Sequence, residues 1–342
     1  MKALVMKQLH ELEMLDVPEP EVGPDQIKVK IAYCGICGSD IEQLEGRFVP
    51  PSRAGASASP RIMGHEASGT IVGIGKEVRG DFKIGQRVAM NFRSSCGACY
   101  YCNNGMEHFC ERALPNRGAM AEYSIYRENC VFELPTSVPL DLGAFLEPLS
   151  VALHATDKAN IHPGASVMIT GAGPIGMLIL QLAIRSGAAR VLVSEPLEDK
   201  RRLAKELGAD VVVNPLAESL EEAAKKLTDG RGFDSILEAS GKAAVCKQVI
   251  PLAEACGTIV WCGVYPSDSE VAVPPFYMYQ RELTIRSIRI SPYGFHRAMH
   301  LLPKLTLKPL LTVYPMKDAI KAFHDHMAGK GVKMMIETST SR

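Results

Sequence analysis

Apolar and polar positions follow different patterns along this chain of 342 residues. Up to about residue 145 they show no helical period and form short runs between turns, such as the alternating Gln-Ile-Lys-Val-Lys-Ile-Ala-Tyr at 26–33. Alternation of this kind predicts half-buried strands, and their succession predicts an all-β barrel. From residue 166 to about 281, strand-like and helix-like patterns alternate, which is typical of a doubly wound parallel sheet. The final segment returns to mixed structure and is expected to pack on the first domain. The predicted fold class is therefore α/β.

The same patterns predict individual elements. The expected strands are 12–17, 26–33, 67–75, 86–90, 167–170, 190–194, 211–213, 234–238, 257–261 and 332–337. The expected helices are 199–207, 219–228, 294–302 and 317–327. Residues 47–61 are too small and proline-rich for a core, and we expect a mobile loop there that forms the rim of a pocket.

A glycine-rich turn joins an apolar strand at 167–170 to a long apolar helical pattern, and a second strand at 190–194 ends at Glu195. This βαβ context predicts a dinucleotide site. A tight turn, a close approach to pyrophosphate and close helix packing explain the three glycines, and the helix N-terminus attracts the phosphates. An acid at Glu195 accepts hydrogen bonds from the adenosine ribose and repels a 2′-phosphate, so NAD is favoured over NADP. The predicted cofactor-binding residues of the turn are Gly171, Gly173, Pro174, Ile175 and Gly176.

Composition narrows the class of protein. The length suits about two domains. With 46% hydrophobic residues, 22% charged residues and a formal net charge of zero, nothing favours nucleic acid or an anionic membrane as a partner. No apolar run reaches the ~18 residues of a membrane span, and the N-terminus lacks a signal-peptide pattern. A cytoplasmic location is therefore expected.

The ten cysteines are unevenly distributed. Cys96, Cys99, Cys102 and Cys110 fall within one short segment, which in a reducing compartment indicates a metal site rather than disulfides. Four thiolates surround Zn²⁺ tetrahedrally and leave no open position, so this site would be structural. An iron–sulfur cluster, or loop cysteines without metal, are the alternatives.

A second, dispersed set contains Cys37, His65, Glu66 and Glu147. A catalytic zinc needs about three protein ligands and one exchangeable position, and thiolate, imidazole and carboxylate groups on loops of a barrel can supply them. Each residue alone is weak support, since a single cysteine or histidine is more often part of a core.

Taken together, the motifs carry a resemblance that covers essentially the whole chain. Their order is Cys-Gly-Ile-Cys-Gly-Ser-Asp at 34–40, Gly-His-Glu at 64–66, the four spaced cysteines, Glu-Pro-Leu-Ser-Val at 147–151 and the glycine turn. This order resembles the zinc-dependent medium-chain dehydrogenases. The glutamate at 147 is similar to the sorbitol and threonine dehydrogenase branch, because the alcohol dehydrogenase branch has a cysteine there. The resemblance implies a GroES-like catalytic domain at 1–150, completed by 286–342, and a Rossmann domain at 151–285.

The resemblance also implies roles for particular residues. Cys37 and His65 match zinc ligands, Glu66 matches a ligand of sorbitol dehydrogenases, and Glu147 matches a direct or water-mediated contact. Asp40 would orient His65.

Ser39 is the expected first proton relay, with Glu66 or Glu147 and a zinc-bound water as an alternative. Capping of a following helix is the structural alternative for Ser39. Near the cofactor, Lys200 matches a basic residue beside the adenosine ribose. Val264, Ile288 and Arg289 fall where the family lines the nicotinamide pocket.

The implied reaction is reversible, NAD-linked oxidation of a secondary alcohol, with one catalytic and one structural zinc per chain and a homodimer or homotetramer as the assembly. A polyol is the favoured substrate. Threonine, an aminocyclitol, a sugar acid or a sugar phosphate remain alternatives, and Arg289, Arg47 or Arg53 would favour the acidic ones. A zinc- and nucleotide-binding protein without turnover is the alternative from a different class.

Overall fold

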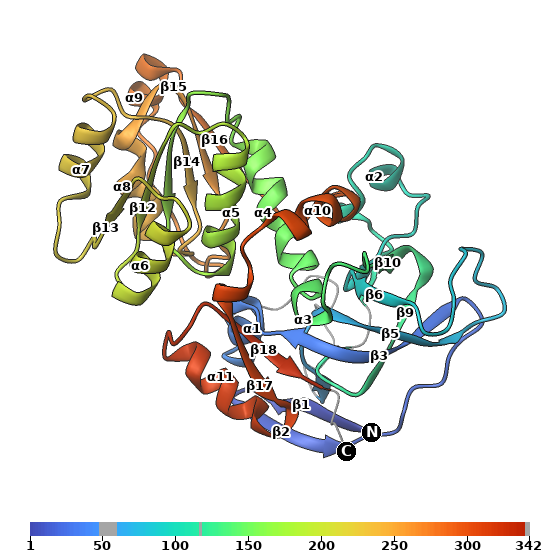
Figure 1. Cartoon of the computed structure of the whole chain (residues 1–342). Helices are drawn as coiled ribbons and strands as arrows, with labels where there is room; N and C mark the ends of the chain where they lie inside the picture. The colour runs from blue at the N-terminus through green and yellow to red at the C-terminus, as the bar shows by residue number, and fades with distance from the viewer. Residues whose placement is uncertain (48–59, 116–117, 339–342) are drawn as a thin grey trace. The chain divides into compact units, whose positions relative to one another are not determined.

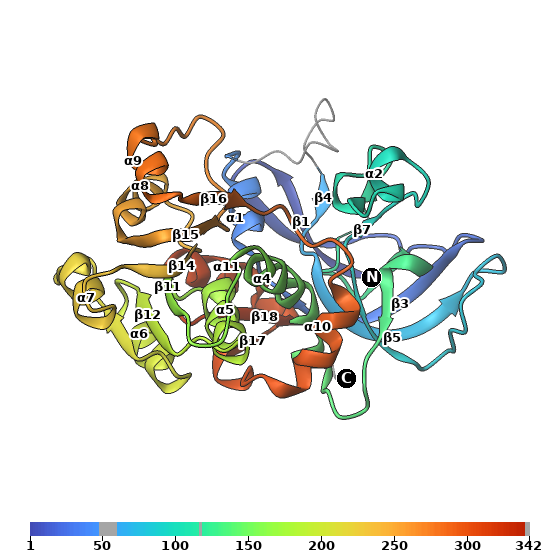
Figure 2. The same cartoon turned by 90° about the horizontal axis from the view of Figure 1, so that it is seen from above.

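The computed structural model describes residues 1–47, 60–115 and 118–338 (Figures 1 and 2). The chain divides into two compact units, one made of Met1–Pro148 with Phe295–Arg342 and the other of Leu149–Gly294. The inserted unit therefore extends beyond the 151–285 segment inferred from sequence at both ends.

The first unit is built around β3 (Gln26–Gly35), which pairs antiparallel with β5, β9 and β18, while β17 pairs parallel with β18. Its larger sheet has the order β10-β6-β5-β3-β18-β17, with β9 on β3, and smaller sheets have the orders β2-β1-β4 and β7-β8. The other strands are β1 (Lys2–Gln8), β2 (Glu11–Asp16), β4 (Arg61–Ile62), β5 (Glu66–Ile74), β6 (Arg87–Met90), β7 (Arg93–Ser94), β8 (Leu114–Pro115), β9 (Tyr123–Arg127), β10 (Val131–Glu133), β17 (Leu311–Pro315) and β18 (Lys333–Glu337).

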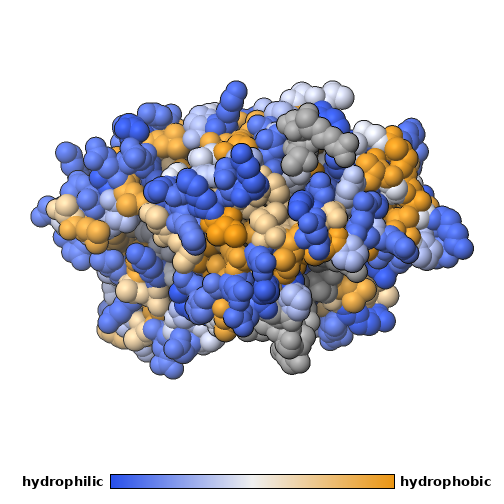
Figure 3. Space-filling model, turned by 90° about the horizontal axis from the view of Figure 1, so that it is seen from below, coloured by the Kyte–Doolittle hydropathy of each residue, from blue (hydrophilic) through white to orange (hydrophobic). Residues whose placement is uncertain are grey.

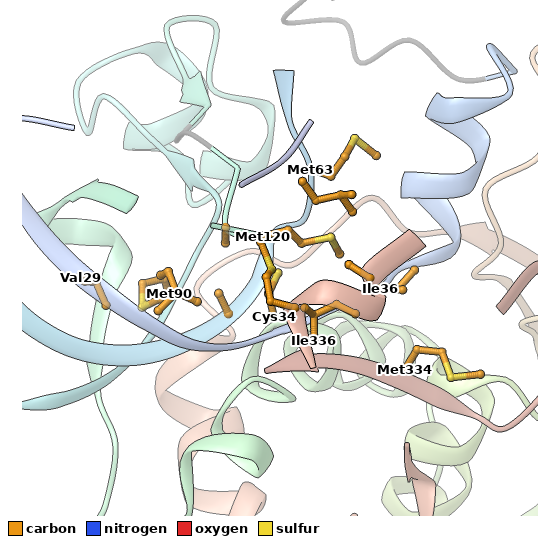
Figure 4. Packing of buried hydrophobic residues seen from close by; sticks show 14 of the residues in the cluster. Val29, Cys34, Ile36, Met63, Met90, Met120, Met334 and Ile336 are labelled. Atoms are coloured by element: carbon orange, nitrogen blue, oxygen red, sulfur yellow. The ribbon is translucent and has the colours of Figure 1, made fainter. Parts of the chain in front are cut away.

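The alternation along β3 explains its place in this unit. Ile27, Val29 and Ile31 are fully buried, while the intervening lysines are not. The C-terminal strand β18 completes the same core, because Ile336 pairs with Cys34 in antiparallel register. Figure 4 shows Met334 and Ile336 among the buried side chains of this core.

Short helices connect these strands. They are α1 (Gly38–Leu44), α2 (Tyr100–Asn103), α3 (Leu140–Gly143), α4 (Leu146–Lys158, which contains the boundary between the units), α10 (Phe295–Leu301) and α11 (Ala319–Met327). Single 3-10 turns lie at Glu107–Phe109, Glu128–Cys130, Leu302–Lys304, Lys308–Leu310 and Met316–Asp318.

The second unit is a six-stranded parallel sheet of order β13-β12-β11-β14-β15-β16. Numbered within the unit, this is the 3-2-1-4-5-6 order of a Rossmann fold, so the predicted doubly wound sheet is confirmed. Its strands are β11 (Ser166–Thr170), β12 (Arg190–Ser194), β13 (Val211–Val213), β14 (Phe233–Glu238), β15 (Ala253–Trp261) and β16 (Thr284–Ser287). Every residue of β11 is buried, as expected for a central strand covered on both faces.

Helices follow these strands in the predicted alternation. They are α5 (Pro174–Arg185), α6 (Glu198–Glu206), α7 (Leu220–Leu227), α8 (Ala243–Val249) and α9 (Pro275–Arg281), with a 3-10 turn at Ile250–Leu252. Ser219 caps α7, because its hydroxyl oxygen accepts the Glu222 N–H at 3.2 Å.

The expectation that the first 145 residues contain no helix is wrong at α1 and at the single-turn helices α2 and α3. The seven residues of α1 make only two turns, too few for a helical period to stand out from the neighbouring strands. The sequence also predicts Glu147 on a loop, whereas the structure has it in the first turn of α4. Most of the 47–61 loop, including Arg53, lies outside the described residues.

Within the described part of the chain, no helix combines the length and apolarity needed to cross a membrane. The face shown in Figure 3 carries hydrophilic side chains around smaller hydrophobic areas. Apolar atoms scattered over a folded surface in this way are ordinary.

A cluster on α11 predicts a pH-dependent contribution to stability. Asp325, with a side chain only 9% exposed, pairs with Lys321 at 2.7 Å and Lys330 at 2.6 Å, and accepts the Tyr314 hydroxyl at 2.8 Å. Hydrogen bonds from Lys321, Lys330 and Tyr314 hold the pKa of Asp325 well below its ordinary range. A depressed carboxyl pKa stabilises the fold above about pH 4, and this stabilisation is lost as the pH falls further.

We therefore expect the thermal midpoint of the wild-type protein to fall more steeply than that of Asp325→Asn between pH 5 and pH 3. Parallel melting curves of both proteins across this range measure the difference. Equal slopes would show that the cluster contributes nothing that depends on pH.

Candidate metal centres and dinucleotide site

Three predicted metal ligands of the first unit converge. Cys37 is the residue before α1, His65 precedes β5, and Glu66 is the first residue of β5. One ligand atom from each lies within 4.8 Å of the others. A thiolate, an imidazole and a carboxylate at this spacing fit Zn²⁺ and leave a fourth position open.

Asp40 holds two members of this set. One carboxylate oxygen lies 3.3 Å from His65 Nδ1, and the other accepts the Cys37 N–H at 3.0 Å. Burial raises the pKa of Asp40, but His65, the Cys37 N–H and Lys333 together outweigh burial and the net pKa is lowered, so Asp40 is a carboxylate. Its contact with Nδ1 leaves His65 Nε2 as the nitrogen available for a metal.

A buried lysine faces the same pocket and was missed from sequence. Lys333 of β18 is 1% exposed, forms an ion pair with Glu66 and donates to the Ile36 carbonyl at 3.0 Å. Gly35 makes room for this pair, because a Cβ there would lie 2.2 Å from Glu66 Oε2 and 2.8 Å from Lys333 Cε. A single lysine inside the apolar run 332–336 was the available signal.

Glu147 is buried in the first turn of α4 and interacts electrostatically with the pocket, but it is not in the set whose ligand atoms lie within 4.8 Å. Burial raises its pKa to about 7; His65 opposes this shift and the Glu66 carboxylate adds to it.

Ser39 lies in the first turn of α1, beside the pocket in sequence. The residue that caps α1 is Cys37, so the alternative role of Ser39 as the helix cap is wrong. Its carbonyl accepts the Gln43 side-chain amide at 3.0 Å.

The four clustered cysteines form a second candidate metal site, with all four ligand atoms within 4.8 Å of one another. Cys99 Sγ lies 3.5 Å from Cys102 Sγ, and the Cys96 N–H donates to Cys110 Sγ at 3.3 Å. Arg93 donates to the carbonyls of His108 and Cys110, the latter at 3.0 Å, and so ties this segment to β7. Four converging sulfurs fit a closed structural zinc site.

The glycine turn of the second unit has the conformation that a pyrophosphate site needs. Gly171 has φ +87°, which favours glycine, and a Cβ on Gly176 would lie 1.9 Å from the Gly171 carbonyl oxygen. A Cβ on Gly173 would meet nothing, so the backbone is accessible there. Pro174 and Ile175 open the twelve-residue helix α5, whose N-terminal N–H groups follow the turn.

Glu195 follows β12 and is 6% exposed. Its two oxygens accept the N–H groups of Ala172 and Leu197, at 2.8 Å and 3.0 Å. The acid therefore ties the glycine turn to the end of the second strand, the place where an adenosine ribose binds in this fold.

The remaining predicted cofactor residues lie in the same unit. Lys200 is in α6, where burial lowers its pKa and Glu195 opposes that shift. Val264 is 50% exposed in the segment after β15. Ile288 and Arg289 follow β16, and the Ile288 N–H donates to the Trp261 carbonyl at 3.3 Å.

Comparisons with known proteins agree with both halves of this description. Residues 23–136 match the alcohol dehydrogenase GroES-like domain, and residues 174–304 match the zinc-binding dehydrogenase family. A sorbitol dehydrogenase from Halalkalibacterium halodurans is 34% identical, over 98% of this chain and 99% of that protein. A D-arabitol-phosphate dehydrogenase from Enterococcus avium is 33% identical, over 96% of this chain and 94% of that protein.

A solved structure is similarly close. A zinc-binding dehydrogenase from Sinorhizobium meliloti 1021, bound to NADP, superposes with a TM-score of 0.90 at 33% identity and covers 98% of each chain. The predicted combination of a GroES-like domain and a Rossmann domain is confirmed, and the chain belongs to the zinc-dependent medium-chain alcohol and polyol dehydrogenases.

Proposed function

We propose that this protein oxidises a secondary alcohol of a polyol to the ketone, reversibly, with NAD⁺ as the hydride acceptor. The observation that carries the proposal is the convergence of Cys37, His65 and Glu66 on a position that a metal can occupy with one site left open. A structural metal needs no such open position. The same chain carries the glycine turn and Glu195, which together suit a nicotinamide dinucleotide.

A zinc ion bound in this pocket would act as a Lewis acid and lower the pKa of an alcohol hydroxyl. The chain's own residues hold and orient that chemistry. Asp40 fixes the ring of His65, and Lys333 balances the charge of Glu66. We assign the first step of proton transfer to the Ser39 hydroxyl. Glu66 and Glu147 are each assigned as a metal ligand or as the alternative proton relay.

The second metal site has a different role. Cys96, Cys99, Cys102 and Cys110 offer no open position, so we assign them one structural zinc. Together the two sites give two zinc ions per chain.

NAD is the proposed cofactor because the Glu195 carboxylate is fixed where a 2′-phosphate would bind. The related structure bound to NADP makes this preference a question for experiment. Lys200, Val264, Ile288 and Arg289 are assigned to the cofactor site from the resemblance.

A polyol is favoured as the substrate over an acidic one. The name of the related sorbitol dehydrogenase gives a polyol as its substrate, whereas the name of the related D-arabitol-phosphate dehydrogenase gives a phosphorylated polyol. Here Arg47 is engaged by both Glu42 and Glu45, with Nε and Nη2 each 2.8 Å from a Glu42 oxygen. Two carboxylates around one guanidinium leave a net negative charge there, which disfavours a phosphate or carboxylate ligand at Arg47.

The proposed assembly is a homodimer or homotetramer that joins through the second unit. Strand β16 is the last of the sheet, and α9, which precedes it in the chain and contacts β15, exposes Phe276 and Tyr279 at 69% and 79%. An open edge and exposed aromatic groups suit contact with another copy. All ten cysteines lie among the described residues and none forms a disulfide there. We propose a reducing, cytoplasmic location, in which clustered thiols are available to bind metal.

A substrate panel tests the reaction. NAD⁺ reduction is measured with polyols, sugar acids, sugar phosphates and threonine, and we expect the highest kcat/KM with a polyol. Cys37→Ser should lower kcat/KM about a thousandfold or more, because it removes a metal ligand, while NADH binding survives. The control Cys256→Ser alters an exposed thiol of the second unit and should retain activity. Full activity of Cys37→Ser would rule out the catalytic metal proposal.

Replacing Glu195 tests the cofactor assignment. Glu195→Ala removes the charge that repels a 2′-phosphate, so the NAD:NADP ratio of kcat/KM should fall about tenfold or more. Glu198→Ala is the matched control, since Glu198 is an exposed acid of α6. An unchanged ratio in Glu195→Ala would mean that Glu195 does not bind the adenosine ribose and does not set the preference for NAD.

A further inference from the structure

Glu238 is a fully buried carboxylate at the carboxyl end of β14, apart from the residues assigned above. One of its oxygens accepts the Ser240 N–H at 2.8 Å, the Ser240 hydroxyl and the Thr170 hydroxyl at 3.3 Å. The other oxygen accepts the Tyr265 hydroxyl. These donors are all neutral, and their hydrogen bonds satisfy both oxygens of the buried carboxyl group.

The donors come from three segments that follow neighbouring parallel strands. Thr170 ends β11 and precedes the glycine turn, Ser240 follows β14, and Tyr265 follows β15. In register, Glu238 pairs with Thr170 on one side and Trp261 on the other. The carboxylate therefore lies at the carboxyl ends of the central strands, where ligands bind in this fold.

The three segments pack directly against one another. A Cβ on Gly171 would lie 3.0 Å from Ser240 Cα, and one on Gly263 would lie 2.5 Å from Gly241 Cα. The ring of Tyr265 also packs against this segment, since a Cβ on Gly263 would lie 3.2 Å from Tyr265 Cζ. The segment that carries Tyr265 is thus connected to the glycine turn through Ser240 and Gly241.

Tyr265 is suited to lock this arrangement. Its hydroxyl contacts both Glu238 and the buried thiol of Cys246 on α8, and burial with these neighbours raises its pKa. The phenol therefore stays a neutral donor at any pH the enzyme meets. Val264, the residue before Tyr265, follows the carboxyl end of β15 and is half exposed.

We propose that Glu238 and Tyr265 form a positioning pair that fixes the 262–266 segment and the glycine turn in the geometry that receives the dinucleotide. The pair rests on the proposed function, because the ligand it serves is the nicotinamide cofactor. It acts by preorganisation: without the phenol–carboxylate bond, the segment must be ordered at the moment of binding, and affinity falls. Neither residue belongs to the metal pocket.

Tyr265→Phe removes only the hydroxyl. Tyr314→Phe is its matched control, because it also takes a phenol donor from a buried carboxylate, that of Asp325 in the first unit. NADH affinity of purified protein is measured by energy transfer from Trp261, the single tryptophan, and thermal midpoints are recorded beside it. The KM for NAD⁺ and kcat are measured with the best polyol.

We expect Tyr265→Phe to weaken NADH binding about tenfold, or about 1.4 kcal/mol. The KM for NAD⁺ should rise with it, while kcat at saturating NAD⁺ changes less than about threefold. Tyr314→Phe should lose thermal stability but keep its NADH affinity within about twofold. Glu238→Gln, which presents an amide N–H to at least one of the same donors, should weaken binding at least as much as Tyr265→Phe.

Two results would overturn the pair. Either Tyr265→Phe and Glu238→Gln keep wild-type NADH affinity while melting lower, or Tyr314→Phe weakens binding as much as Tyr265→Phe. A wild-type protein that binds no NADH would reject the proposed function together with the pair. Wild-type binding with unchanged variants rejects the pair alone.

Discussion

The first unit depends on how it balances buried charge in one pocket. Three carboxyl groups, those of Asp40, Glu66 and Glu147, are buried there beside the partly exposed Cys37 thiol, and the buried Lys333 faces them. Charge this deep is costly unless it is paired, and removing one partner of such a pair typically costs about 3–5 kcal/mol. Within the chain, Asp40 is paired with His65 and Glu66 with Lys333, so these buried carboxylates are held in place before any metal binds.

The backbone brings these groups together from distant parts of the chain. Strand β3 delivers Gly35 and leads to Cys37, β5 begins at Glu66, and β18 supplies Lys333 some 300 residues later. Glycine permits the closest approaches, since Gly64 has φ +83° and its Cβ would lie 2.6 Å from Cys34 Sγ. The four-cysteine segment needs no such assembly, because all its ligands lie between residues 96 and 110.

Sequence patterns predicted what is local or strongly periodic. The strands at 190–194 and 211–213 were placed at their observed bounds, because buried parallel strands are continuous apolar runs. Sequence patterns did not predict pairs of residues that are brought together by contacts between distant segments. Lys333 pairs with Glu66 only because β18 joins β3, and Glu238 meets Tyr265 only through three adjacent segments. The helix α1 was missed because two turns carry too little periodicity.

The zinc content of the purified protein tests the central claim most directly. Elemental analysis should find two zinc ions per wild-type chain and one in His65→Ala, which loses the open site and keeps the four-cysteine site. One zinc per wild-type chain, or two in His65→Ala, would contradict the assignment of an open metal site to Cys37, His65 and Glu66.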